Sequence, residues 1–263
     1  MKFGGTSVAD LERIHPSAYV ARILDASPAS GIAYLDPDTA LSPGSVRAAR
    51  LAAGAVIDAV RAIARGETTR AFAAVRPPGH HAEPGQAMGF CLFSNVAVAA
   101  RVAQAEGLER VAVIDFDVHH GNGTQAAFET DDSLFLGSIH QSPLYPGTGS
   151  ADERGVGNIA NAPVAPHASP ATWRALFEQA LLGPLDAFRP DLVLISAGFD
   201  AHRRDPLAHQ SLEAEDFAWA TRAVLTVARR HAKGRLVSTL EGGYDLEGLG
   251  LSSVAHMQAL GEE

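Results

Sequence analysis

The chain has 263 residues, of which 46% are hydrophobic, and a single cysteine. This length suits one α/β domain over residues 1–263, and one cysteine excludes an intramolecular disulfide. Lys and Arg number 21 against 30 Asp and Glu, for a net charge of -9, and no basic tract is present that could neutralise a nucleic-acid backbone. Without a membrane-length apolar run or a signal-peptide pattern, we expect a cytoplasmic protein that binds neither nucleic acid nor membrane.

The chain opens with MKFGGTS, residues 1–7. Lysine, glycine and hydroxyl side chains are residue types that cradle phosphate, and this short stretch resembles the start of amino-acid kinases. A kinase needs further phosphate and aspartate contacts at other strand ends, whereas the later strand ends of this chain carry different residues. We therefore expect no nucleotide site at this end of the chain.

Helical and strand-like patterns alternate from residue 42 onwards. Ser42 and Pro43 predict the N-cap and first turn of a helix whose apolar residues recur at helical spacing until Gly66 ends it. The predicted strands are 71–75, 111–116, 134–139, 192–196 and 236–240, and the further predicted helices are 94–106, 170–188, 213–232 and 246–260. Apolar strands that alternate with helices predict a mainly parallel sheet in a three-layer α/β/α sandwich.

Four of the predicted strands are followed by a polar segment that contains glycine. RPPGHHAE follows the first strand, and DFDVHHGNGTQ, SAGFDAHRRDP and EGGYDL follow the strands that end near residues 114, 195 and 240. The carboxyl ends of parallel strands line the ligand crevice of an open sheet. We therefore expect these four segments to converge on one site.

Asp117 and His119 lie two residues apart at a predicted strand end, so their side chains point to the same side. Asp200, at a neighbouring strand end, can supply a third ligand. Two carboxylates and one imidazole leave a coordination position open, which is typical of a catalytic zinc site. The simpler alternative is that Asp117 and His119 only hydrogen-bond to each other, but the agreement of four strand ends favours the metal.

Three further residues are candidates for proton transfer and charge stabilisation. His80 and His81 follow a stiff Pro-Pro-Gly sequence and could take a proton from an attacking water, although adjacent histidines are more often surface residues. Tyr244 follows two glycines that allow a close backbone approach. It is either a packing tyrosine or a hydrogen-bond donor to an oxyanion.

Together these segments resemble the zinc-dependent histone deacetylase family, in particular its class II branch with bacterial members and the related acetylpolyamine amidohydrolases. The segments RPPGHHAEPGQAMGFCLFSNVAVAA, DFDVHHGNGTQ, IHQSPLYPGTG, ISAGFDAHRRDPL and LEGGYDL occur in family order, and the resemblance extends from about Asp10 to the C-terminus. It implies the arginase/deacetylase fold. It also implies a hydrolase that removes acetyl or other acyl groups from lysine side chains or small amines and releases acetate and a free amine.

The resemblance also implies roles for individual residues. The implied zinc ligands are Asp117, His119 and Asp200, and the implied catalytic residues are His81 for proton transfer, His80 assisting against Asp115, and Tyr244 as the oxyanion donor. The implied substrate contacts are Asp38 at the rim, Phe90 and Tyr145 as aromatic walls of the acyl tunnel, and Gly89 and Leu207. A monovalent cation such as K⁺ is implied near Asp115, Asp117, His119 and Ser138.

Asn122, in HHGNG, stands where class I members of the family have an acid. An asparagine stabilises a neighbouring histidinium less than a carboxylate does, so we expect His81 to titrate lower than in a class I enzyme.

Three alternatives remain open. Leu207 stands where eukaryotic polyamine deacetylases have a glutamate, which favours acyl-lysine or small acylated amines over acetylpolyamines. Arginases share the fold but hold two manganese ions, and the residue two positions after Asp200 is His202 rather than a second aspartate. Finally, the segment that resembles the family begins without the family's first strand, and the third alternative is therefore a catalytically weak module that binds acyl-lysine.

Overall fold

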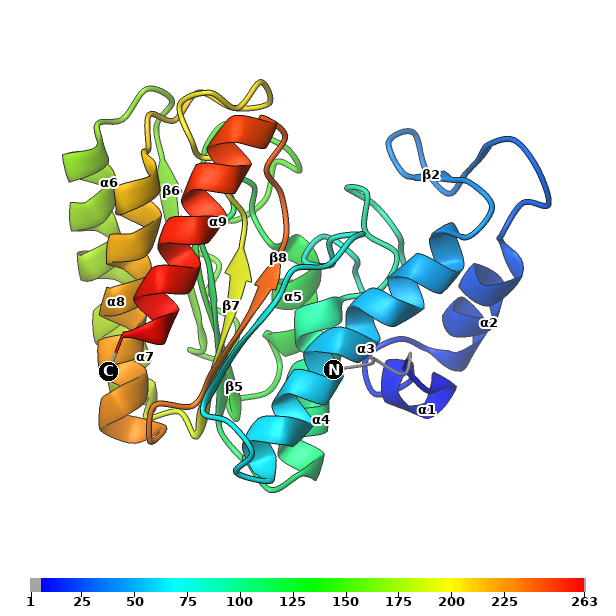
Figure 1. Ribbon diagram of the computed structural model, residues 1–263, viewed down its shortest axis with the longest axis horizontal. Helices are drawn as coiled ribbons and strands as arrows, with labels where there is room; N and C mark the ends of the chain where they lie inside the picture. Colours follow the sequence, from blue (N-terminus) through cyan, green and yellow to red (C-terminus); the bar gives the residue numbers. More distant parts are fainter. Residues whose placement is uncertain (1–5, 263) are drawn as a thin grey trace.

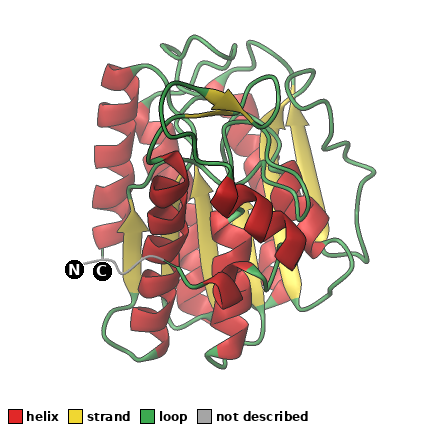
Figure 2. Ribbon diagram, turned by 90° about the vertical axis from the view of Figure 1, so that its right-hand side faces the viewer, coloured by secondary structure: helices red, strands yellow, loops and turns green. Residues whose placement is uncertain are grey.

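The computed structural model describes residues 6–262, and a six-stranded sheet lies at its centre (Figures 1 and 2). The strand order is β3-β8-β7-β4-β5-β6, and every neighbouring pair is parallel. The strands are β3 (Arg70–Ala73), β4 (Val111–Asp115), β5 (Leu134–Gln141), β6 (Ile159–Val164), β7 (Leu192–Ala197) and β8 (Leu236–Leu240). A separate two-stranded antiparallel sheet consists of β1 (Ala33–Tyr34) and β2 (Ala40–Leu41).

Alternate residues of the central strand β4 enter two different apolar cores. Val111 and Val113 pack in the core beneath α3 (Ser45–Ala64) and α4 (Asn95–Ala105). Ala112 and Ile114 pack in the core on the opposite face of the sheet. The elements that cover this opposite face are α6 (Pro170–Phe177), the π-helix η1 (Glu178–Leu182), α7 (Gly183–Phe188), α8 (Ala214–His231) and α9 (Leu246–Gly261). Because side chains alternate along a strand, an apolar strand buries both faces, and the predicted three-layer sandwich is confirmed.

Helix α3 begins later than the sequence predicts. Its N-cap is Gly44, at φ 93°, and Ser42 and Pro43 lie outside the helix. The hydroxyl of Ser45 accepts a hydrogen bond from the Ser42 N–H, the reverse of the expected cap. Only glycine adopts a left-handed backbone conformation without steric strain, so the chain turns into the helix at Gly44.

The predicted helix 170–188 is one helical segment with a wider turn in its middle. Ser169 caps its start by accepting a hydrogen bond from the Thr172 N–H. Residues Glu178–Leu182 form a π-helix just before Pro184, which lies in the first turn of α7. Proline lacks the N–H that an α-helical ladder would use, and this accounts for the break at that point.

Several elements were not predicted. They are β1, β2, β6, α1 (Val8–Leu11), α2 (Ser17–Asp25) and α5 (Asn122–Phe128). In β6, Asn161 and Pro163 interrupt the apolar pattern, and β6 is an edge strand, where proline is tolerated. Of the opening MKFGGTS, residues 1–5 lie outside the described residues, while Ser7 is the N-cap of α1 and accepts a hydrogen bond from the Asp10 N–H.

Among residues 6–262, no helix combines the length and the apolar character that a membrane crossing requires.

Candidate active site

The predicted metal ligands lie together at the carboxyl end of the sheet. Asp117 and His119 follow β4, Asp200 follows the neighbouring strand β7, and all three are buried. His119 Nδ1 lies 3.1 Å from Asp117 Oδ1 and 3.0 Å from Asp200 Oδ2. Each residue offers one potential ligand atom, and these three atoms all lie within 4.8 Å of one another, so that a single ion could bind all three. The prediction that these residues converge is confirmed.

The surroundings of the two carboxylates fit a cation. Asp117 Oδ2 accepts the Gly242 N–H at 2.8 Å, and Asp200 Oδ1 accepts the Val118 N–H at 2.9 Å. Burial, together with the negative charge of Asp117, raises the pKa of Asp200 to about 7. Two buried carboxylates this close to each other are costly without a positive charge between them. Their oxygens and one imidazole nitrogen are a ligand set that suits zinc.

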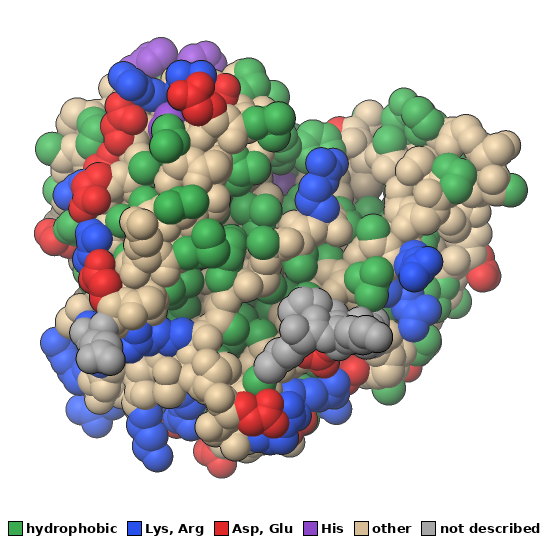
Figure 3. All heavy atoms as spheres, in the orientation of Figure 1, with side chains coloured by type: hydrophobic (Ala, Val, Ile, Leu, Met, Phe, Trp, Pro, Cys, Tyr) green, Lys and Arg blue, Asp and Glu red, His purple; other side chains and the backbone are tan. Residues whose placement is uncertain are grey.

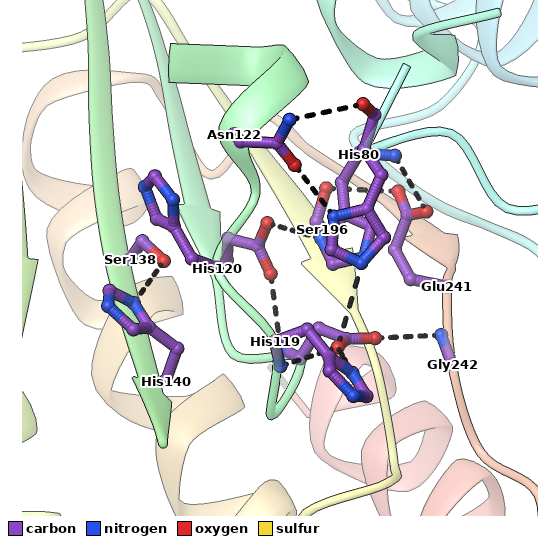
Figure 4. A network of polar contacts seen from close by, with 12 residues as sticks. His80, His119, His120, Asn122, Ser138, His140, Ser196, Glu241 and Gly242 are labelled. Carbon is purple, nitrogen blue, oxygen red and sulfur yellow. Dashed lines mark hydrogen bonds and ion pairs between the residues drawn. The ribbon is translucent and has the colours of Figure 1, made fainter. Parts of the chain in front are cut away.

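The adjacent histidines have different partners, and Figure 4 labels His80 and Asn122 among these residues. His80 Nδ1 donates to Asp115 Oδ2 at 2.9 Å, and His81 Nδ1 donates to Asn122 Oδ1 at 2.8 Å. Burial alone would lower the pKa of His80, but the charges of Asp115 and Asp117 raise it well above its ordinary value. Burial and the charge of His80 lower the pKa of His81 well below its ordinary value. A neutral His81 whose Nδ1 carries the proton has Nε2 available as a proton acceptor.

Tyr244 lies at the same end of the sheet, after β8. Its ring meets that of Phe90 edge-on, with 6.0 Å between centroids, and its side chain is 38% exposed. Its backbone N–H donates to Asp205 Oδ2 at 2.7 Å, while Asp205 Oδ1 accepts the Leu207 N–H. Asp205 therefore holds the segment with Tyr244 beside the segment with Leu207. Burial raises the pKa of the Tyr244 hydroxyl, which keeps it protonated as a donor.

The remaining predicted substrate contacts form a rim around these residues. Asp38 Oδ1 accepts the Gly89 N–H at 2.9 Å and so ties the loop before β2 to the segment with Phe90. Phe90 and Tyr145 are both partly exposed, and the ring of Tyr145 stands edge-on to His81 with 5.1 Å between centroids. The aromatic side chains therefore stand between solvent and the buried polar groups.

The predicted monovalent cation has only indirect support. Ser138 on β5 is in register with Asp115 on β4, so both flank the same part of the sheet. The Ser138 hydroxyl, however, is 2.9 Å from His140 Nδ1, and within residues 6–262 the group Asp117, His119 and Asp200 alone meets the geometry of a metal cluster. The cation near Ser138 stays a prediction.

Glu241 is a functional candidate that the sequence analysis did not single out. It is buried after β8, and its Oε2 accepts the N–H groups of Gly79 at 2.6 Å and His80 at 3.2 Å. Its Oε1 accepts the Ser196 hydroxyl at 3.1 Å. Figure 4 shows it reaching from β8 toward the histidine segment. The only sequence feature that pointed to a function for Glu241 was its place in the EGGYDL segment. Sequence spacing does not reveal which backbone N–H groups a carboxylate will accept.

His140 is a buried histidine whose position residue type alone does not reveal. It lies on β5, with Nδ1 against Ser138 and Nε2 against the Gly149 carbonyl. Its ring lies 4.8 Å from that of His120, which also contacts Thr148 and Gln125. All eight residues of β5 are buried, so even a histidine there is enclosed.

Comparison with known proteins agrees with the resemblance that the sequence motifs show. Residues 2–260 match the family model described as "Histone deacetylase domain". A histone deacetylase-like amidohydrolase from Pseudomonas aeruginosa is 44% identical over 241 residues, which cover 89% of this chain and 63% of that protein. A probable deacetylase from Archaeoglobus fulgidus is 39% identical over 246 residues, covering 92% of this chain and 68% of its own length. The chain thus spans about two thirds of each relative.

A solved structure has the same architecture. The crystal structure of the HDA15 HD domain superimposes with a TM-score of 0.95 at 39% sequence identity. The match covers 100% of this chain and 75% of that one.

Proposed function

Since the chain belongs to the histone deacetylase family, we propose that it is a zinc-dependent amide hydrolase that removes acyl groups from lysine side chains of peptides or proteins, or from small amines. The observation that carries this proposal is the meeting of three side-chain groups at one end of the sheet. These are the Asp117, His119 and Asp200 cluster, the two adjacent histidines, and Tyr244.

In this proposal Asp117, His119 and Asp200 hold the zinc ion, which supplies Lewis acidity and lowers the pKa of water. His81 takes a proton from the attacking water at Nε2 and returns it to the leaving amine. Its hydrogen bond to Asn122 fixes the ring and its tautomer. The hydroxyl of Tyr244 donates to the oxyanion that develops on the acyl carbonyl.

His80 has a different role from His81. Its hydrogen bond to Asp115 and its raised pKa make it a positive charge beside the reacting groups rather than a proton acceptor. That charge opposes protonation of His81, whose ring centroid is 4.0 Å away. The pair thus divides two roles, a fixed charge and a neutral base, between neighbouring residues.

The aromatic rim favours a substrate with an aliphatic stem. Phe90, beside Tyr244, and Tyr145, beside His81, offer partly exposed ring surfaces next to the buried groups, as the four-carbon stem of an acyl-lysine requires. Leu207, 43% exposed and linked to Tyr244 through Asp205, gives no counter-charge to a second ammonium group. We therefore propose acyl-lysine in preference to acetylpolyamines.

A single-metal site is part of the proposal. His202 Nε2 faces Glu213 Oε2 at 3.6 Å instead of the metal cluster, so among the described residues no bridging carboxylate for a second ion comes from that position. Two manganese ions per chain, measured by elemental analysis, would contradict this part.

The test is hydrolysis of a fluorogenic acetyl-lysine peptide by zinc-loaded protein, compared with acetylspermidine and acetylputrescine. We expect turnover of the peptide that a chelator abolishes and that zinc restores. Tyr244→Phe and His81→Ala should lose activity, whereas the exposed Tyr34→Phe and His167→Ala should keep it. No turnover by folded, zinc-loaded protein would favour a binding module, and faster cleavage of the polyamines would overturn the preference for acyl-lysine.

A further inference from the structure

Tyr244 lies on a short segment between β8 and α9, and its side chain is held loosely. Among residues 6–262 the Tyr244 hydroxyl has no hydrogen-bond partner, and its ring, 38% exposed, meets that of Phe90 only edge-on. A donor to an oxyanion must nevertheless stand about 3 Å from the oxygen that it stabilises. The position of this hydroxyl therefore depends on how the backbone of Tyr244 is held.

The chain before Tyr244 is anchored at Gly242 but not at Gly243. The Gly242 N–H donates to Asp117 Oδ2 at 2.8 Å, and its carbonyl accepts the Phe199 N–H at 2.8 Å. Gly243 is at φ 140°, a backbone conformation that glycine adopts freely and that strains other residues. Because Gly243 is a natural pivot, the anchor at Gly242 does not by itself fix the direction in which Tyr244 points.

The chain after Tyr244 is tied to the segment that follows β7. Asp245 is the N-cap of α9, and its Oδ1 accepts the Gly248 N–H at 2.7 Å and lies 3.0 Å from Arg204 Nε. Arg204 also reaches Glu247 at 2.6 Å. Figure 3 shows side chains of both charges together above the start of α9, at the top of the view. Exposed ion pairs contribute little to stability, so this tie is the weaker one.

Asp205 supplies the stronger tie. It is 7% exposed, and its Oδ2 accepts the N–H of Tyr244 itself at 2.7 Å. Its Oδ1 accepts the Leu207 N–H at 3.0 Å, and its own N–H donates to the His202 carbonyl at 2.9 Å. Hydrogen bonds to an ionised acceptor that is shielded from solvent are among the strong ones. The carboxylate thus meets the backbone directly after the pivot at Gly243.

We propose that Asp205 is the positioning residue for the Tyr244 hydroxyl, an inference that rests on the proposed function of Tyr244 as the oxyanion donor. Its carboxylate fixes the backbone after Gly243 and so keeps the hydroxyl in one place at the carboxyl end of the sheet. Asp205 is outside the group of potential metal ligands and acts through Tyr244. Because it also holds the Leu207 N–H, the oxyanion donor and Leu207 share one anchor.

The first measurement is hydrogen–deuterium exchange of the zinc-loaded protein, read on the peptide with residues 241–246. We expect the Asp205→Ala variant to exchange the amides of this segment about 10-fold faster than the wild type, because the Tyr244 N–H loses its acceptor. The strand β7 should exchange at the wild-type rate. This measurement requires no turnover and tests the tether independently of the proposed function.

The second measurement is steady-state hydrolysis of an acetyl-lysine peptide. We expect kcat of Asp205→Ala to fall by about 100-fold, as a displacement of about 1 Å can cause, with KM and zinc content unchanged. Asp205→Asn keeps one carbonyl acceptor and should show a smaller fall. Asp131→Ala is the matched control, because Asp131 accepts the Ser133 N–H at 2.9 Å at the opposite end of the sheet, and its kcat should equal that of the wild type.

The Tyr244→Phe variant separates positioning from a general loss of stability. If Asp205 acts by placing the Tyr244 hydroxyl, Asp205→Ala has nothing left to misplace once that hydroxyl is removed. We therefore expect Asp205→Ala to leave the residual kcat of Tyr244→Phe unchanged. A loss of folded protein would instead lower kcat in both backgrounds by the same factor.

Three results would overturn the inference. They are wild-type exchange of residues 241–246 in Asp205→Ala, wild-type kcat of this variant in an active enzyme, and a fall in kcat that is equally large with and without the Tyr244 hydroxyl. If Asp205→Ala does not fold, Asp205→Asn serves for the same comparisons with smaller expected changes. A wild type that hydrolyses no acylated amine refutes the proposed function, and the exchange of residues 241–246 then decides whether Asp205 holds this segment.

Discussion

Gly242→Ala should weaken zinc binding without removing any ligand. A Cβ atom at this position would lie 2.3 Å from Asp200 Oδ2 and 2.7 Å from Asp117 Oδ2, whereas ordinary van der Waals contact begins at 3.4 Å. The backbone of Gly242 is outside the left-handed region, so alanine is excluded by these contacts and not by its own conformation. Asp200 must retreat by about 1 Å, and a misplacement of that size can cost about 100-fold in activity.

The assay is calorimetric titration of metal-free protein with zinc, followed by peptide hydrolysis. We expect the zinc affinity of Gly242→Ala to fall by about 10-fold to 100-fold, the range seen when groups that position metal ligands are changed. Gly183→Ala is the matched control, because a Cβ there meets no atom within 4 Å. Unchanged zinc affinity in folded Gly242→Ala would refute the assignment of Asp117 and Asp200 as ligands.

Three further predictions concern protonation and position. Asn122→Asp should raise the pKa of His81 and move the acidic limb of the kcat/KM profile to higher pH by about one to three units; an unmoved limb would exclude His81 as the base. Glu241→Gln weakens the acceptor that holds the His80 backbone, so kcat should fall about 10-fold with zinc content unchanged, and a change confined to KM would contradict this. Burial lowers the pKa of His256 from 6.5 to about 3, so the unfolded state binds more protons between these values. The stabilisation of the fold by His256 is thus complete above pH 6.5 and declines as the pH falls, and urea unfolding should show the stability gap to His256→Asn narrowing by about 1.4 kcal/mol per pH unit.

The sheet and the convergence of the site were predictable because both follow from repeated local patterns. Apolar runs of strand length alternate with helices, and parallel strands bring their carboxyl ends to one edge. These patterns are sufficient to predict that Asp117, His119 and Asp200 lie together, as they do in the structure. Strand β6 was not predicted because Pro163 breaks its apolar pattern, and an edge strand tolerates such a break.

Contacts between segments that are distant in sequence were less predictable. Glu241 is separated from Gly79 by 162 residues, and nothing in its spacing indicates that its carboxylate receives that backbone N–H. The burial of His140 likewise depends on β6 and the loop at Gly149 closing over β5. Residue type favours the surface for a histidine, but tertiary packing decides the outcome.

The glycines at the strand ends show that the metal site requires close backbone packing as well as the right ligand residues. A Cβ atom at Gly198 would lie 2.1 Å from Asp117 Oδ2, and one at Gly121 would lie 2.3 Å from Asp115 Oδ2. Together with Gly242, they let backbone from three strand ends close directly around the carboxylates. That closure buries Asp117 and Asp200 almost fully, which raises the cost of leaving their charges unpaired and so strengthens the demand for a cation. A chain with the same three ligands but larger residues at these glycines would hold its carboxylates farther apart and better hydrated. It would lose the electrostatic reason for binding the metal along with the geometry.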